Sequence, residues 1–214
     1  QSKLSTSMTR LSTGFRINSA MDDAAGLQIA TRLKAQTSGM TVAMNNTQNS
    51  TSLLQTAEGA FAEVTNMLVR MKDLATQAAD ASSTANDKTA MQAEYNALGQ
   101  ELYNVMTNTT FGGTKLLGNG AAGNGTLSGS MTFQIGASST EKMSFDVSSN
   151  LSALNTALVG LSTNFSSAGT TTSSELTTCA NATIGQLAAA IDSVSTVRSA
   201  LGATANRLDH VNTN

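Results

Sequence analysis

Proline and tryptophan are absent from this chain of 214 residues, and cysteine and histidine each occur once, as Cys179 and His210. A single cysteine cannot form an internal disulfide bond, so disulfides do not hold the fold together. Aromatic residues make up only 4% of the chain. Because a compact enzyme core usually depends on aromatic bulk, alanine, leucine, valine and methionine must fill this core instead. Such side chains suit closely packed helices.

Charge is also scarce, since 12% of residues are charged and the formal net charge is −2. The chain has no basic run and no alternation of basic with aromatic residues, so we expect no nucleic-acid partner. No stretch approaches the roughly 20 apolar residues of a membrane span, so we expect no membrane partner. No signal peptide opens the chain, but Gln1 is not an initiator methionine and the start is therefore uninformative.

Apolar residues at helical spacing predict one long helix that ends near Ala79. Ser19 is the expected N-cap, and Asp22 and Asp23 suit the positive end of the helix dipole. The clearest part of the pattern steps by three and four residues through Leu54, Ala57, Phe61, Val64, Leu68, Met71, Ala75 and Ala78. This heptad-like stripe needs partner helices along its length. A continuous helix of about 55 residues would be on the order of 80 Å long.

Two further helices and a hairpin complete the predicted elements. A second helix over about 87–107 carries Met91, Tyr95, Leu98, Leu102 and Val105 at the same spacing. Apolar residues alternate with polar ones on both sides of a turn at Gly136–Glu141, which predicts a β-hairpin. The alternating residues are Met131, Phe133, Ile135, Met143, Phe145 and Val147. A last helix from about 175 has Leu187, Ile191, Val194, Leu201 and Leu208 on one face.

The predicted fold class is therefore mainly α, an elongated bundle of long helices with a β-hairpin near one end. We expect one domain with four parts: amino-terminal helices over 1–117, the hairpin region over 118–150, a short variable linker over 151–174, and the carboxy-terminal helix over 175–214. Residues 160–174 are of low complexity, with little to bury.

No set of residues predicts catalysis, a metal site or a cofactor. His210 has no nucleophile signature near it, so we expect a solvent-facing or capping role. Cys179 is expected to be a small buried hydrophobe. Dipole complementation explains Asp22 and Asp23 without a metal. The ten methionines fall mostly on apolar stripes and are expected to pack in the core. We therefore expect no enzyme activity.

Arg70, Leu74 and Gln77 form a separate stripe, about 100° around the helix from the main apolar one. One interpretation is that Leu74 widens the buried face and Arg70 is its solvated flank. The other is that Leu74 is exposed beside Arg70, where a partner could desolvate both side chains. The pattern alone favours the first interpretation.

Several longer stretches resemble bacterial flagellin in the order that the family has them. They are LSTGFRINSAMDDAAGLQIATRLKAQ (11–36), LLQTAEGAF (53–61), RMKDLATQAA (70–79), TTFGGTKLL (109–117) and VRSALGATANRLDHVNTN (197–214). The resemblance implies a helical rod domain with a hairpin and a structural subunit of the extracellular flagellar filament. It also implies other flagellin subunits as partners, an export chaperone for the full-length chain, and export without a cleaved signal peptide.

The chain departs from the family pattern at its ends. Flagellins begin with a further helical segment before Gln1 and continue beyond Asn214, so we expect a rod-domain fragment that lacks both terminal coiled-coil segments. Outer variable domains are reduced to the stretch around 118–175. The hook-associated junction protein of the flagellum shares this architecture and is the alternative function.

The resemblance also bears on the stripe of Arg70, Leu74 and Gln77. Flagellins of many swimming bacteria are bound by the vertebrate Toll-like receptor five, an innate immune receptor. The family's receptor-contacting residues match Arg70, Leu74 and Gln77, with Glu94 on the next helix. The resemblance therefore implies that these four residues bind the receptor, with Leu74 as the exposed apolar contact.

Overall fold

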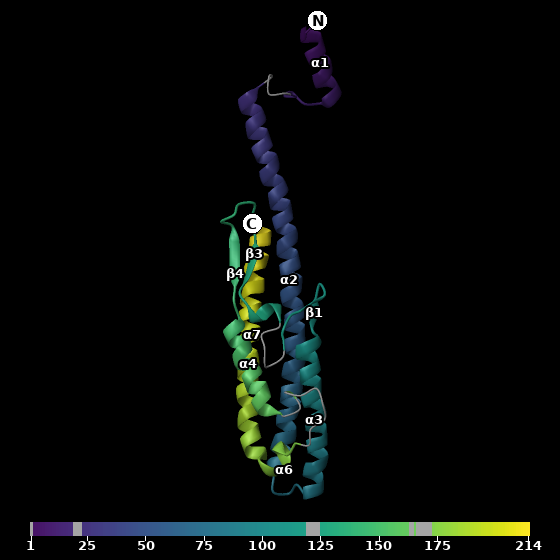
Figure 1. The fold of residues 1–214 in the computed structure, drawn as a ribbon, viewed down its shortest axis with the longest axis vertical. Coiled ribbons are helices and arrows are strands. Elements are labelled where there is room, and N and C mark those ends of the chain that lie inside the picture. Colours follow the sequence, from purple (N-terminus) through teal and green to yellow (C-terminus); the bar gives the residue numbers. More distant parts are fainter. Residues whose placement is uncertain (1, 19–22, 119–124, 163–164, 166–172) are drawn as a thin grey trace. The chain divides into compact units, whose positions relative to one another are not determined.

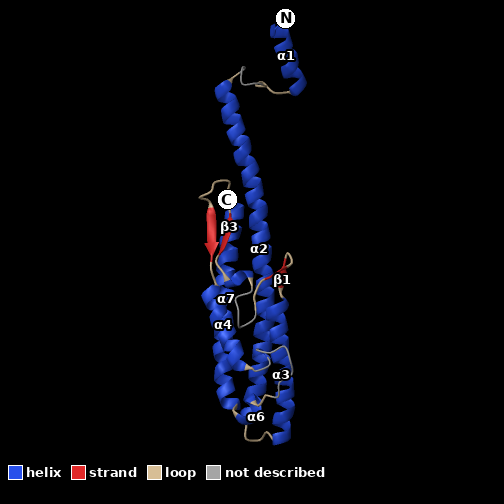
Figure 2. Cartoon of the chain, viewed as in Figure 1, coloured by secondary structure: helices blue, strands red, loops and turns tan. Residues whose placement is uncertain are grey.

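A computed structural model describes residues 2–18, 23–118, 125–162, 165 and 173–214 of the chain (Figure 1). Helices dominate the described residues, with two short two-stranded sheets (Figure 2). The helices are α1 (Ser2–Thr13), α2 (Ala24–Ala79), α3 (Ala85–Asn108), η1 (Thr126–Ser128), α4 (Ser148–Leu161), α6 (Glu175–Thr178) and α7 (Ala180–Thr213). The strands are β1 (Thr110–Phe111), β2 (Thr114–Lys115), β3 (Met131–Gln134) and β4 (Lys142–Phe145). The mainly helical fold class is confirmed.

The chain divides into two compact units, each of which is described separately. The first comprises Gln1–Asn46 and Gln134–Lys142, and the second comprises Thr47–Phe133 and Met143–Asn214. α2 contributes residues to both units, and the second unit holds the helices that contain most of the buried residues.

α2 is one unbroken helix of 56 residues, which confirms the predicted long helix and its end at Ala79. The helix begins after Asp23, whose carboxylate accepts a hydrogen bond of 2.9 Å from the backbone N–H of Gly26. Asp23 is therefore the cap, since such a bond satisfies a donor that has no partner within the helix. Ser19, the expected cap, and Asp22 lie outside the described residues.

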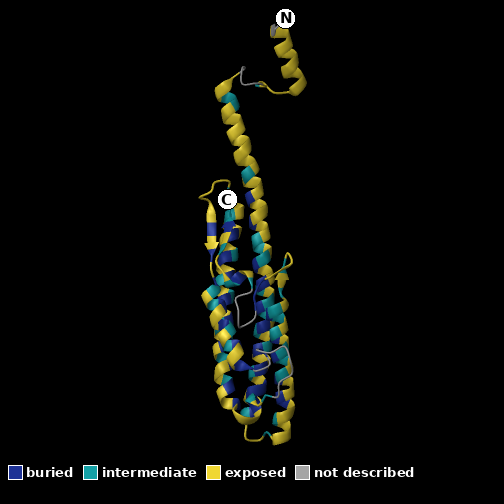
Figure 3. Cartoon of the chain, viewed as in Figure 1, coloured by how far each residue is buried: buried dark blue, intermediate teal, exposed yellow. Residues whose placement is uncertain are grey.

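The apolar stripe of α2 forms the core of the second unit, as its spacing predicts. Its eight residues from Leu54 to Ala78 are each 0 or 1% exposed. On α7, Leu187, Val194, Leu201 and Leu208 are buried, and Ile191 is half-buried. Figure 3 shows these buried positions concentrated between the helices of this unit.

The buried stripe of α3 differs in part from the prediction. Met91, Tyr95 and Leu102 are buried as expected, but Gly99 and Met106 take the places predicted for Leu98 and Val105. These two predicted residues are half-buried. The buried positions follow the 3.6-residue period of a straight helix more closely than the 3.5-residue period of a heptad.

α4 occupies residues for which the sequence analysis predicted a variable linker. Its buried residues, Leu151, Leu154, Leu158 and Leu161, repeat the three-and-four spacing of the other helices. Asp146 accepts a hydrogen bond of 2.9 Å from the backbone N–H of Ser148 at the start of α4. The second unit therefore contains one more long helix than predicted, and residues 166–172 of the low-complexity stretch lie outside the described residues.

The predicted hairpin is present as the pair β3 and β4. The rings of Phe133 and Phe145 stack with their centroids 6.4 Å apart. In the first unit, the turn of this hairpin packs on α2, where a Cβ added to Gly39 would lie 2.8 Å from that of Ala137. Gly39 thus permits the close approach of the turn to the helix.

A second hairpin, β1 and β2, was not predicted. Phe111 pairs with Thr114 across it. The two residues between the strands, Gly112 and Gly113, have φ angles of 58° and 83°. Two consecutive positive φ angles are typical of the tightest two-residue hairpin turn, which strongly favours glycine.

Candidate protein-interaction surface

The short connection from α2 to α3 places the stripe of Arg70, Leu74 and Gln77 beside Glu94. Gln77 lies in the last turn of α2, and its carbonyl accepts a hydrogen bond of 2.7 Å from the hydroxyl of Ser83. A capping box between Thr84 and Asp87 then begins α3. The capping box satisfies two backbone N–H groups at the start of α3, those of Thr84 and Asp87, so the new helix begins within a few residues of the end of α2.

Arg70 and Glu94 form an ion pair between α2 and α3. The Nε atom of Arg70 donates a hydrogen bond of 2.7 Å to Oε1 of Glu94, and the two side chains are 53% and 45% exposed. This hydrogen bond and the charge of Glu94 raise the pKa of Arg70 above its ordinary value. Water screens a pair this exposed, so it contributes little to stability. The pair instead presents a forked donor and a carboxylate together on the surface.

Leu74 is only 2% exposed, so the prediction of an exposed leucine beside Arg70 is wrong. The contact between Arg70 and Glu94 shows that α3 lies beside this flank of α2. Leu74 widens the buried face, as the first interpretation predicts. Gln77 is exposed. The surface therefore consists of Arg70, Gln77 and Glu94 above a buried leucine.

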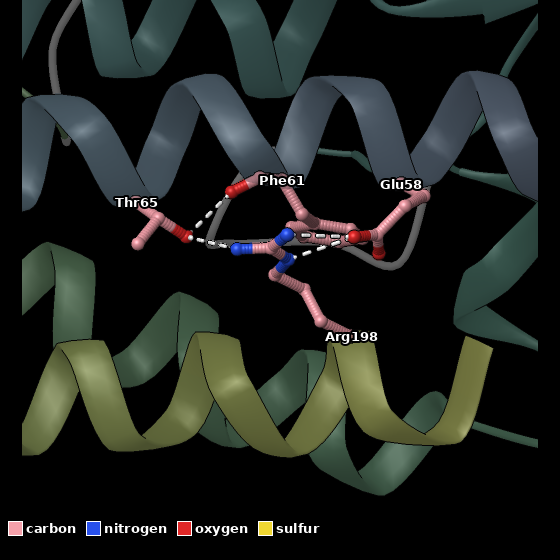
Figure 4. Close-up of polar contacts among 4 residues, drawn as sticks. All are labelled: Glu58, Phe61, Thr65 and Arg198. Carbon is pink, nitrogen blue, oxygen red and sulfur yellow. Dashed lines mark hydrogen bonds and ion pairs between the residues drawn. The ribbon is translucent and has the colours of Figure 1, made fainter. Parts of the chain in front are cut away.

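A second ion pair, which the sequence analysis missed, joins α2 to α7 (Figure 4). Nε of Arg198 donates to Oε1 of Glu58 at 2.9 Å, and Nη1 donates to the hydroxyl of Thr65 at 3.4 Å. That hydroxyl in turn donates to the carbonyl of Phe61 at 2.7 Å. Both charged residues flank apolar stripes, which is the position where interhelical charge pairs form. The position of Glu58 and Arg198 beside the apolar stripes is therefore the feature of the sequence that could have predicted this ion pair.

Gln92 and Tyr95 make buried polar contacts that the sequence analysis did not predict. Gln92 is 5% exposed and Tyr95 is fully buried. Burial is the main cause that raises the pKa of Tyr95 far above its ordinary value, so its hydroxyl stays protonated. In the sequence, Gln92 directly follows Met91, a core position of the apolar stripe, and this placement could have predicted a buried polar contact.

The residues considered for catalysis or metal binding lie on different elements of the structure. His210 is exposed in the last turn of α7, as expected. Cys179 is exposed, so its prediction as a buried hydrophobe is wrong. It lies between α6 and α7, and Ala180 and Thr183 take the buried positions there. Among the methionines that the structure describes, Met71, Met91, Met106 and Met143 are buried, whereas Met8, Met40 and Met44 are exposed and do not pack as predicted.

Neither a metal site nor a membrane span is found in the part of the chain that the structure describes. No group of three or more His, Cys, Asp or Glu side chains there could hold a metal ion. No helix among the same residues is long and apolar enough to cross a bilayer.

The family model for the N-terminal helical region of bacterial flagellin matches residues 1–122, more than half of the chain. The chain belongs to the bacterial flagellin family. Polar flagellin F of Vibrio parahaemolyticus is 50% identical over 146 residues, which cover 68% of this chain and 37% of that flagellin. Flagellin D of Vibrio cholerae is 51% identical over 136 residues, which cover 64% and 34%.

A solved flagellin shares the fold. The crystal structure of Bacillus cereus flagellin matches with a TM-score of 0.64 and 29% identity, and the match covers 80% of this chain and 88% of that one. The chain spans about a third of the length of the curated Vibrio flagellins that it matches. The flagellin family is a family of structural proteins.

Proposed function

We propose that the protein is a structural subunit of the bacterial flagellar filament. The observation that carries this proposal is the family match over residues 1–122, which includes the whole of α2. The function is assembly by packing with other flagellin subunits rather than catalysis. The subunit acts outside the cell and reaches the filament through export without a cleaved signal peptide, with a chaperone that binds the full-length chain.

The composition of native flagella tests this proposal. A filament subunit is the bulk component of the purified appendage, whereas a hook-associated junction protein is a trace component. The junction protein remains the alternative because it shares this architecture. The identity of about 50% to named Vibrio flagellins favours the filament subunit.

We propose in addition that Toll-like receptor five recognises the surface of Arg70, Gln77 and Glu94. The specific support is that side chains from two helices meet there, with an exposed guanidinium 2.7 Å from an exposed carboxylate. A partner that desolvates a forked donor and its acceptor gains directional hydrogen bonds. Leu74 lies beneath this surface and contributes through packing that supports Arg70, rather than as an exposed contact.

Arg70→Ala should weaken receptor binding by about 1–2 kcal/mol, or about 5- to 30-fold in Kd, because truncating an arginine at an interface centre typically costs that much or more. Surface plasmon resonance with the purified receptor ectodomain gives the Kd, and circular dichroism checks the helical signal. Arg198→Ala is the matched control, since Arg198 forms a similar ion pair between α2 and α7. Equal binding by parent and Arg70→Ala, or no binding by the parent, would contradict the receptor proposal.

A further inference from the structure

Two residues one turn apart on α3 hold both ends of the connection from α4 to α6. Tyr95 reaches the last residue of α4, where its hydroxyl donates a hydrogen bond of 2.9 Å to the carbonyl of Leu161. Gln92 reaches α6, where its Oε1 accepts a hydrogen bond of 2.6 Å from the backbone N–H of Leu176. The chain therefore leaves α4 and enters α6 at neighbouring points of the same helix.

The amide of Gln92 is bonded at both of its polar atoms. Nε2, which has two N–H donors, lies within hydrogen-bond distance of three acceptors: Oε2 of Glu175 at 2.8 Å, Oδ1 of Asn96 at 2.9 Å and the hydroxyl of Ser173 at 3.2 Å. The Ser173 hydroxyl also donates to Asn96. A buried amide with all of its groups satisfied rigidifies its surroundings, whereas an unsatisfied one is costly. Gln92 thus specifies the position of residues 173–176 on α3.

The hydrogen bonds of Gln92 and Tyr95 are buried, so water cannot easily take the place of their partners. Tyr95, Leu161 and Leu176 are each 0 or 1% exposed, and Gln92 is 5% exposed. α6 itself has only four residues, too few to be a stable helix without tertiary contacts. Its order must therefore come from the groups that bind it. The Gln92 amide bonds the backbone N–H of Leu176, and the hydroxyl of Thr183 donates to the carbonyl of Glu175 at 3.3 Å.

We infer that Gln92 and Tyr95 form a clasp that fixes the end of α4 and the start of α6 on α3. The clasp holds α6, and with it the first turn of α7, independently of the length of chain between Leu161 and Ser173. Closing a longer flexible loop adds little entropic cost, since that cost grows only with the logarithm of loop length. Extra residues in this connection should therefore leave the contact between Gln92 and Leu176 in place.

Hydrogen exchange at the Leu176 amide, measured by NMR, reports directly on the clasp because this N–H donates to Gln92. Gln92→Met keeps the side-chain length and removes the polar bonds, so the Leu176 amide should exchange at least tenfold faster. Gln100→Met is the matched control on the same helix, and should leave that rate within twofold. An unchanged rate in Gln92→Met would overturn the clasp.

A second pair of variants keeps the test decisive if Gln92→Met does not fold. Gln92→Glu places a carboxylate against Glu175 and should speed exchange at Leu176 at least tenfold through repulsion. Combining it with Glu175→Gln exchanges the amide and the carboxylate, and should restore the parental rate within threefold. Failure of the double variant to restore the rate would contradict a specific Gln92–Glu175 contact.

The independence from loop length is tested by inserting twelve Gly and Ser residues between Ala168 and Gly169. With Gln92 intact, exchange at Leu176 should stay within threefold of the parental rate. With Gln92→Met in the lengthened chain, exchange should accelerate more than in Gln92→Met alone. If lengthening alone frees the Leu176 amide, the connection rather than the clasp holds α6.

Discussion

Leu68→Ala should lower the free energy of unfolding by about 2–5 kcal/mol, because truncating a fully buried leucine removes apolar contacts and leaves a cavity. Leu68 is 0% exposed in the middle of the α2 stripe. Urea denaturation followed by far-UV circular dichroism measures the change. The midpoint should fall with little change in slope, since the area exposed on unfolding stays almost the same.

Leu33→Ala provides the matched control on the same helix. Leu33 is 57% exposed, so its truncation should change the free energy of unfolding by less than about 0.5 kcal/mol. Equal effects of the two substitutions would mean that the stripe from Leu54 to Ala78 is not the core of the second unit.

Phe145→Ala should cost about 3–5 kcal/mol of unfolding free energy, the range for removal of a buried phenylalanine. Phe145 is 6% exposed and stacks on Phe133, so the substitution removes both a buried ring and an aromatic pair. Differential scanning calorimetry should show a fall in Tm of more than about 5 °C.

Phe15→Ala is the control for this prediction, since Phe15 is 70% exposed and its ring has little to lose on truncation. It should leave Tm within about 1–2 °C of the parent. An unchanged Tm in Phe145→Ala would show that the β3–β4 hairpin packs loosely, and would remove it from the stabilising core.

Periodicity predicted the long helices because their burial is regular. The three-and-four steps of α2 match its fully buried residues, and the absence of proline permits a helix of 56 residues. The same spacing was present in α4 at Leu151, Leu154, Leu158 and Leu161. That helix was missed because serine and threonine around it gave the impression of a low-complexity linker. A short apolar stripe needs a partner to be stable, and the partner was not visible in the sequence.

Only part of the candidate surface could be predicted from the sequence, as the burial of Leu74 shows. A helical pattern identifies which residues share a face, but not how many neighbouring helices cover that face. α2 has α3 on one flank, through Arg70 and Glu94, and α7 on the other, through Glu58 and Arg198. Leu74 is buried although it lies outside the main apolar stripe, on the side of α2 that carries Arg70. The contacts of Gln92 with α6 join residues more than 80 positions apart, so local patterns could not predict them.

The composition of native flagella shows most directly whether this chain belongs to the subunit of the filament. Filaments sheared from the source bacterium are digested with trypsin, and the peptide of residues 73–88 is quantified against a labelled standard by mass spectrometry. We expect this peptide in molar amounts comparable to the bulk protein of the filament. A trace amount, on the order of a hundredth of the bulk protein or less, would contradict the filament role and support the junction protein instead.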